Sequence, residues 1–159
     1  MPEARVERTF EAPIDQVWKM WVEPEQFASW YGPPGAVIPT CEMDVELSGR
    51  RFIAMEMEGP NGAMQMYFVG EFVEIDPPTR LVYSESLANA DGSPQDTSAM
   101  PPGAPTSTQV IVELTDVGGT STEVIVRHVG IPADSPGAMG WQLALGKLAA
   151  RLADSATSG

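Results

Sequence analysis

Apolar and polar residues alternate with a period of two through most of the middle of the chain. This alternation is typical of β-strands that bury one face and expose the other. Short segments rich in Gly, Pro, Asn and Asp interrupt it, and such turns join consecutive antiparallel strands. With a similar segment near the N-terminus, the pattern predicts antiparallel strands over residues 5–11, 38–47, 51–58, 64–75, 80–87, 108–115 and 121–129.

A different spacing follows the first strand, between Pro13 and Pro24. Apolar residues there recur at the i, i+3, i+4 and i+7 positions of one helix face, and they are Ile14, Val17, Trp18 and Trp21. Proline suits the first turn of a helix, and the residue before a proline avoids the helical conformation. We therefore expect a helix between the two prolines, with Trp18 and Trp21 as anchors of the core.

A second apolar cluster, of Phe27, Trp30 and Tyr31, lies directly before a Gly-Pro-Pro-Gly breaker at residues 32–35. It predicts a second short helix, which the breaker ends. Two interpretations are open for Trp30 and Tyr31. Their side chains either fill the core or form the rim of a cavity.

The C-terminal part of the chain has the spacing of a long helix. Ser135 is a candidate N-cap, and Pro136 suits the first helical position. Charged residues are sparse and the apolar stripe is broad; it comprises Met139, Trp141, Leu143, Leu145, Gly146, Leu148, Ala150 and Leu152. We expect Gly140 to allow a close backbone approach and residues 154–159 to fray.

Residues 88–107 form a long connection that is rich in Ala, Asp, Gly, Ser and Pro. A connection of this length inside a compact domain is either a functional flap or a mobile excursion. The sequence leaves both interpretations open.

The predicted order is one strand, two short helices, six strands and a long helix. An antiparallel sheet with one apolar face needs a cover on that face, and the long helix is the one element large enough to supply it. We therefore expect an α+β fold in which a curved seven-stranded antiparallel sheet wraps around the C-terminal helix. The chain is long enough for one such domain over residues 1–159.

Short motifs are spread over nearly the whole chain. They are Phe10-x-Ala12-Pro13, Val17-Trp18, Trp30 before Gly32, Cys41 to Asp44, Gly70 with Glu74-Ile75, Pro77-Pro78, Arg80-Leu81, Thr122 to His128, Gly140-Trp141 and Leu148. In this order and spacing the chain resembles the START/Bet v 1-like (SRPBCC) superfamily with its helix-grip fold. More narrowly, it resembles the activator of Hsp90 ATPase homologues. The resemblance implies a cavity for a small apolar ligand between sheet and helix, with Hsp90 or another protein as a candidate partner.

The charge of the chain argues against two classes of partner. It has 22 acidic and nine basic residues, which gives a formal net charge of −13. Phosphate backbones and anionic membrane surfaces would be repelled by this charge. Neither nucleic acid nor a membrane is therefore expected as a partner.

The sequence has few residues suited to cofactors. Cys41 is the single cysteine and His128 the single histidine, which excludes an internal disulfide, a cysteine cluster and a histidine-pair zinc site. Nucleotide-binding loop motifs are also absent, so we expect no cofactor and no metal. The N-terminus begins with charged residues and lacks the apolar run of a secretory signal, which predicts a cytoplasmic protein.

His128 and Glu85 are the two candidates for acid–base chemistry. Alternation along their strands places His128 in phase with Val126, and Glu85 in phase with Tyr83, on the predicted inner face of the sheet. Histidine titrates near neutral pH, and a buried carboxylate is costly unless it is paired. The alternative for each is structural, with the histidine held by a neighbouring group and the carboxylate at a strand end that reaches solvent.

Other inner-face residues are expected to line the cavity. Thioether side chains are flexible and polarizable, so methionines suit a wall that adapts to apolar ligands, although they suit an irregular core equally well. We assign Met55 and Met66 to the wall and the other methionines to the core. The complete predicted lining is Trp30, Tyr31, Met55, Met66, Phe68, Tyr83, Glu85, Val126, His128, Trp141 and Leu145.

Three functions are consistent with these observations. The first is a binding protein that carries or senses a small apolar molecule. The second is a cochaperone-like activator of the Hsp90 ATPase, which rests on the family resemblance alone. The third is an enzyme of the cyclase or hydrolase type, with His128 and Glu85 as general acid and base.

Overall fold

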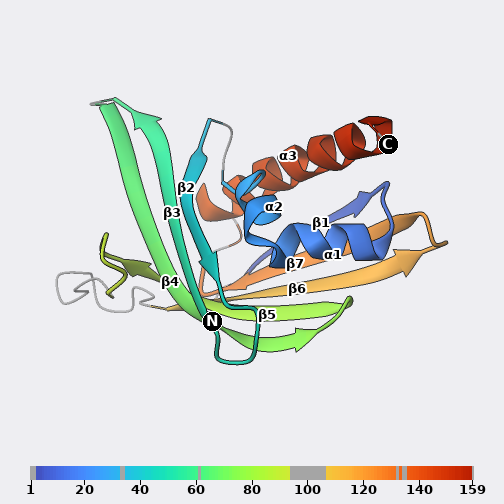
Figure 1. Cartoon of the computed structure of the whole chain (residues 1–159), viewed down its shortest axis with the longest axis horizontal. Coiled ribbons are helices and arrows are strands. Elements are labelled where there is room, and N and C mark those ends of the chain that lie inside the picture. The colour runs from blue at the N-terminus through green and yellow to red at the C-terminus, as the bar shows by residue number, and fades with distance from the viewer. Residues whose placement is uncertain are drawn as a thin grey trace.

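A computed structural model describes residues 3–32, 35–60, 62–93, 107–131, 133 and 136–158. Ser135, most of the 88–107 connection and the side chains of the C-terminal tail lie outside the described residues. The elements are β1 (Glu3–Phe10), α1 (Ile14–Val22), α2 (Pro24–Ala28), β2 (Val37–Met43), β3 (Arg50–Gly59), β4 (Gly62–Asp76), β5 (Arg80–Ala88), β6 (Thr108–Val117), β7 (Ser121–Val129) and α3 (Pro136–Ser158) (Figure 1).

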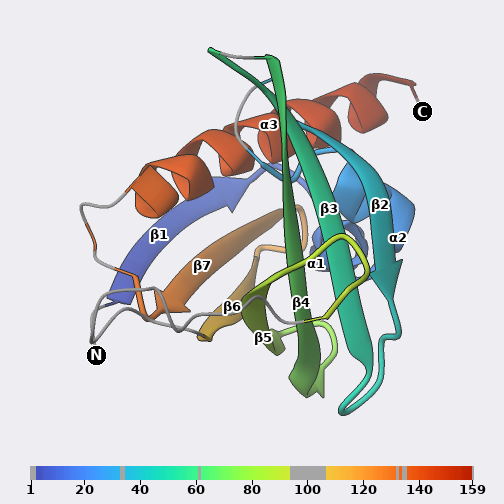
Figure 2. The same cartoon turned by 90° about the vertical axis from the view of Figure 1, so that its left-hand side faces the viewer.

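The seven strands form one antiparallel sheet in the order β1-β7-β6-β5-β4-β3-β2. The sheet curves strongly, and α3 lies across its concave side, whereas α1 and α2 close one end (Figure 1). The β3–β4 hairpin rises past α3, so one part of the sheet stands free of the helix (Figure 2). The predicted fold class is confirmed.

Two glycines fix where strands end or bend. β2 ends at Met43, four residues earlier than predicted, because residues 44–49 fold into a turn with backbone bonds from Asp44 N to Arg50 O and from Gly49 N to Glu46 O. A Cβ atom at Gly49 would meet the carbonyl oxygen of Asp44. Gly70 similarly lies against the Ser84 carbonyl, close to the point where the β4–β5 register shifts. Neither position has room for a side chain.

The core follows the predicted periodicity. The buried face of α1 includes Val17, Trp18 and Trp21, as the helical spacing indicated. Phe27 of α2 and Trp30 are fully buried beside Trp21. From the other side the helix α3 contributes buried Leu145, Leu148 and Leu152.

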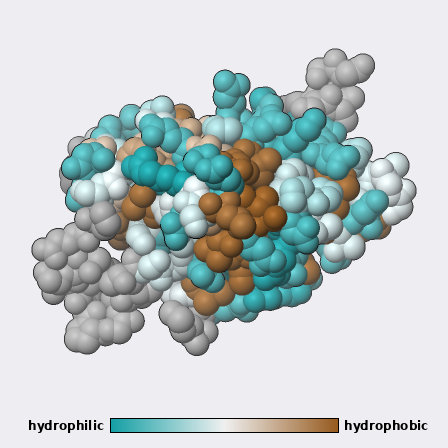
Figure 3. All heavy atoms as spheres, turned by 60° about the horizontal axis from the view of Figure 1, so that its bottom comes forward, coloured by the Kyte–Doolittle hydropathy of each residue, from teal (hydrophilic) through white to brown (hydrophobic). Residues whose placement is uncertain are grey.

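The convex side of the sheet carries both charged and apolar groups. Arg80 and Arg127 form a chain of ion pairs across five strands, with Glu74, Glu113 and Glu3. Exposed pairs of this kind contribute little each. Figure 3 turns the lower side of the molecule forward and shows an apolar band between hydrophilic regions.

Candidate functional site

A cavity of about 510 Å³ lies between the sheet and the N-terminal half of α3. Its walls come from residues 31–32 in the segment that follows α2, the free part of the β3–β4 hairpin, the ends of β5 and β7, and α3. The lining residues are Tyr31, Gly32, Met55, Met57, Met66, Phe68, Glu85, His128, Met139, Gly140, Trp141, Leu143 and Ala144. Met139 and Leu143 are 64% and 45% exposed, so they mark the mouth of the cavity.

Seven of the predicted lining residues face this cavity; they are Tyr31, Met55, Met66, Phe68, Glu85, His128 and Trp141. The remaining predicted residues are in the core and outside the lining; they are Trp30, Tyr83, Val126 and Leu145. The inner-face assignment of Tyr83 and Val126 was sound, but these positions are deeper in the sheet, beneath the packed part of α3.

Trp30 and Tyr31 take different roles, although the sequence treated them as a pair. Trp30 is fully buried, and its indole N–H donates to the Met20 carbonyl at 2.9 Å. The Tyr31 ring stacks on Phe27 at a centroid distance of 4.5 Å and borders the cavity. Of the two, only Tyr31 lies at the cavity, and Trp30 supports it from behind.

The sequence missed several lining residues near the mouth. Met57 and Met139 were assigned to the core, but both line the cavity because the hairpin and the start of α3 extend beyond the packed region. A Cβ atom at Gly140 would meet no described residue within 4 Å. The expected close backbone approach at Gly140 is therefore wrong, and this glycine instead leaves open space in the wall.

Arg51 is the feature of the site that the sequence analysis overlooked. Its side chain is only 2% exposed, and its guanidinium lies 3.6 Å from the centroid of the Tyr83 ring, with Phe27 and Phe72 also close. Arg51 Nη1 lies 3.9 Å from Glu85 Oε2. Arg51 is thus a buried cation in an aromatic cage, and Glu85 is its nearby carboxylate.

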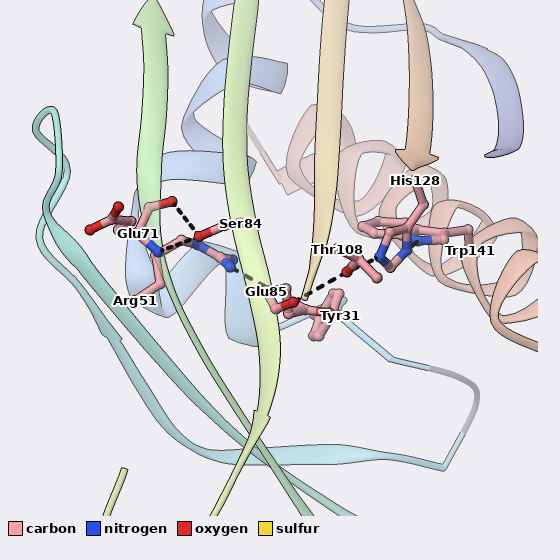
Figure 4. A network of polar contacts seen from close by, with 8 residues as sticks. All are labelled: Tyr31, Arg51, Glu71, Ser84, Glu85, Thr108, His128 and Trp141. Carbon is pink, nitrogen blue, oxygen red and sulfur yellow. Dashed lines mark hydrogen bonds and ion pairs between the residues drawn. The ribbon is translucent and has the colours of Figure 1, made fainter. Parts of the chain in front are cut away.

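Glu85 connects this cage with the cavity. Its Oε2 atom accepts a long hydrogen bond of 3.5 Å from the Tyr31 hydroxyl (Figure 4). Burial raises the pKa of the Glu85 carboxyl, while the positive charge of Arg51 and the Tyr31 hydrogen bond oppose that rise. The same burial, together with the Glu85 charge, raises the pKa of the Tyr31 phenol well above its usual value, so Tyr31 keeps its proton.

His128 is held by two neighbours. The Trp141 indole N–H donates to His128 Nδ1 at 3.0 Å, and His128 Nε2 lies 2.8 Å from Thr108 Oγ1 (Figure 4). Because Nδ1 accepts a hydrogen bond, the proton of the neutral ring is on Nε2, which donates to Thr108. Thr108 in turn donates to the Glu85 backbone carbonyl at 3.3 Å. This chain of hydrogen bonds joins α3, β7, β6 and β5.

The same environment makes folding stability depend on pH. Burial lowers the pKa of His128 to about 4, below the value of about 6.5 expected in the unfolded chain. The unfolded state therefore binds the proton first, and we expect stability to fall as the pH drops from 6.5 toward 4, by up to about 3 kcal/mol in total.

A comparison with His128→Gln isolates this effect, because Glu85 is present in both proteins and its own titration cancels. Urea unfolding at several pH values should show the stability difference between wild type and variant shrinking on acidification. A stability difference that does not change with pH would contradict a neutral His128 ring that is hydrogen-bonded at both nitrogens.

Fold and cavity together define the class of protein. An antiparallel sheet of seven strands gripping a C-terminal helix, with a cavity between them, is the helix-grip architecture of START/Bet v 1-like (SRPBCC) proteins. Residues 11–153 match the family described as "Activator of Hsp90 ATPase homolog 1-like protein". The chain belongs to this family.

Solved structures show the same fold at low sequence identity. A crystal structure of a protein from Chromobacterium violaceum is 22% identical, with a TM-score of 0.74, and the match covers 96% of this chain and 98% of that chain. A Mycobacterium smegmatis protein is 20% identical with a TM-score of 0.76, covering 94% and 90%. The AHSA1 protein of Silicibacter pomeroyi is 20% identical with a TM-score of 0.71, covering 96% and 99%. A comparison with curated proteins gives no significant match.

In the described part of the chain, no helix is both long enough and apolar enough to cross a membrane. Within the same residues, no group of three or more His, Cys, Asp or Glu side chains is placed to hold a metal ion.

Proposed function

We propose that this protein binds a small apolar molecule in the cavity between the sheet and α3. The observation that supports this most is the composition of the wall. Methionine, leucine, phenylalanine and tryptophan side chains supply most of it, and the few polar groups gather at its inner end. Cavities of this volume and composition are typical of small-molecule sites.

The exposed apolar surface at the mouth of the cavity supports the same function. Met139, Leu143 and Met66 line the cavity while remaining substantially exposed to water. An apolar ligand would remove this surface from water and gain roughly 25 cal/mol for each Å² that it buries. Methionine walls can adjust to ligands of different shape, because three rotatable bonds and a polarizable sulfur allow repacking.

The hydrogen bonds of His128 favour this function over acid–base catalysis. His128 and Glu85 do line one cavity, as the enzyme hypothesis required, but no hydrogen bond joins their side chains among the described residues. Both ring nitrogens of His128 already contact protein groups, and a pKa of about 4 makes it a weak base. A protein partner such as Hsp90 stays a prediction that rests on the family description.

Filling the open space at Gly140 should weaken binding. Gly140→Leu places a side chain inside the cavity, so we expect the affinity for the neutral dye Nile red to fall by about ten-fold or more, which is about 1.4 kcal/mol. The dye fluoresces in apolar surroundings, so a fluorescence titration measures the change directly. Leucine is also a better helix former than glycine, so folding should not suffer.

Gly146→Leu is the matched control. Gly146 is on the same helix but outside the cavity lining, and an added Cβ there approaches only the flexible end of Arg8. This variant should bind Nile red like the wild type. Equal binding by wild type and Gly140→Leu would place the dye elsewhere and overturn the proposed function.

A further inference from the structure

The cavity has a single polar end, and that end has a definite hydrogen-bonding character. Glu85, Tyr31, His128 and Trp141 are the lining residues whose side chains carry ionisable or hydrogen-bonding groups. Their donors are already used: Tyr31 donates to Glu85, Trp141 donates to His128, and His128 donates to Thr108. A ligand therefore meets no free side-chain donor among the described lining residues.

An acceptor does remain. Glu85 Oε2 is engaged by Tyr31 and lies near Arg51, but Glu85 Oε1 has no hydrogen-bond partner in the described part of the structure. Glu85 is a lining residue of the cavity, so this second carboxylate oxygen is the acceptor that a ligand can reach. Ligand groups at this end can donate to a carboxylate oxygen.

No cationic side chain is among the described residues that line the cavity. The lining contains no Lys or Arg, and the stretches outside the description contain none of the nine basic residues of the chain. Arg51 is shielded by Tyr83, Phe27 and Phe72, and the neutral His128 ring adds no charge. The Lys147 ammonium is not part of the lining, and it donates to the backbone carbonyls of Tyr31 and Gly32. A carboxylate at the polar end would face the Glu85 carboxylate, and Arg51 beside it is already paired with Glu85, so this approach is costly in apolar surroundings.

We infer that the ligand is an apolar molecule with a terminal hydrogen-bond donor, a hydroxyl or an amine, which binds Glu85 Oε1, and that apolar carboxylates are rejected. This inference rests on the proposed function and adds the chemical class of the ligand. The preference for a ligand with a donor over one without should be large. A buried acceptor that meets no donor has lost its hydrogen bonds to water and gains none in return.

The test compares decylamine, 1-decanol and decanoate, which share one chain length and differ in the end group, as competitors for bound Nile red. Concentrated salt in every titration screens the net charge of the exposed surface. The amine and the alcohol should each displace the dye at concentrations about ten-fold or more below those needed for decanoate.

Glu85→Gln removes the carboxylate and should reduce the preference for decylamine over decanoate by about ten-fold or more. Glu58→Gln makes the same charge change at an exposed position of β3 outside the cavity and should keep the wild-type ranking. The wild-type ranking decides the inference even if Glu85→Gln does not fold.

The outcomes separate the two proposals. Decanoate that displaces the dye as well as decanol, or better, overturns the donor inference and leaves the proposed function standing. A wild-type protein that binds neither Nile red nor any of the three compounds overturns the proposed function itself.

Discussion

Replacing Arg51 with methionine should destabilise the protein by about 3–5 kcal/mol, because removing one member of a buried ion pair leaves the other charge uncompensated. Arg51 is 2% exposed and Glu85 is buried beside it, so water cannot take over the role of the cation. The guanidinium also loses its contact with the Tyr83 ring. Urea unfolding followed by circular dichroism measures the loss.

The double variant Arg51→Met with Glu85→Gln serves as the control. Replacing both members of a buried pair by neutral groups is often close to neutral in stability. We therefore expect the double variant to recover most of the stability that Arg51→Met loses. An Arg51→Met protein as stable as the wild type would show that Glu85 carries no charge at neutral pH, which contradicts the description of the polar end of the cavity.

Trp30→Ala should cost about as much, roughly 3–5 kcal/mol, because it removes a large, fully buried side chain and leaves a void. The Trp30 ring packs against Trp21 at 4.7 Å, Phe27 at 5.2 Å and Tyr31 at 6.1 Å between centroids. Its loss also removes the support behind Tyr31. Thermal and urea unfolding give the stability change.

Trp30→Phe separates packing from hydrogen bonding. This variant keeps a ring in the site and loses the bond from the indole N–H to the Met20 carbonyl, so it should cost markedly less than alanine. If alanine and phenylalanine were equally destabilising, the packing of the aromatic cluster would not be the source of the stability.

Periodicity predicted the fold well because it reports directly on which face of an element is buried. Alternation placed Glu85 and His128 on the concave face, and the register confirms that both are there, across β6 from one another. The helical spacing of Trp18 and Trp21 likewise identified the buried side of α1. These inferences required only the residue pattern of a single element.

Arg51 is a buried residue that the periodicity argument did not identify. Two consecutive arginines next to a turn suggest a solvated strand end, yet Arg51 is in phase with Ile53 and Met55 on the inner face. That phase was the signal that could have found it. Its aromatic cage could not be predicted, because Phe27, Phe72 and Tyr83 come from three separate elements.

The sequence also could not predict which inner-face residues line the cavity and which belong to the core. Met55 and Tyr83 both alternate onto the inner face, but one lines the cavity and the other is beneath the helix. The difference arises from how far the β3–β4 hairpin extends past α3 (Figure 2). Periodicity within a strand gives no information on how far the hairpin extends beyond the helix.

The central claim is that an apolar ligand occupies the cavity beneath α3, and the methyl resonances of the methionines test it most directly. Met55, Met57, Met66 and Met139 line the cavity, whereas Met20 and Met43 are outside it and serve as internal references. In a two-dimensional methyl spectrum recorded during titration with 1-decanol, the four lining methyls should shift and saturate together while the two references stay in place. A titration in which the lining methyls do not move, or in which Met20 and Met43 shift equally, would contradict the account.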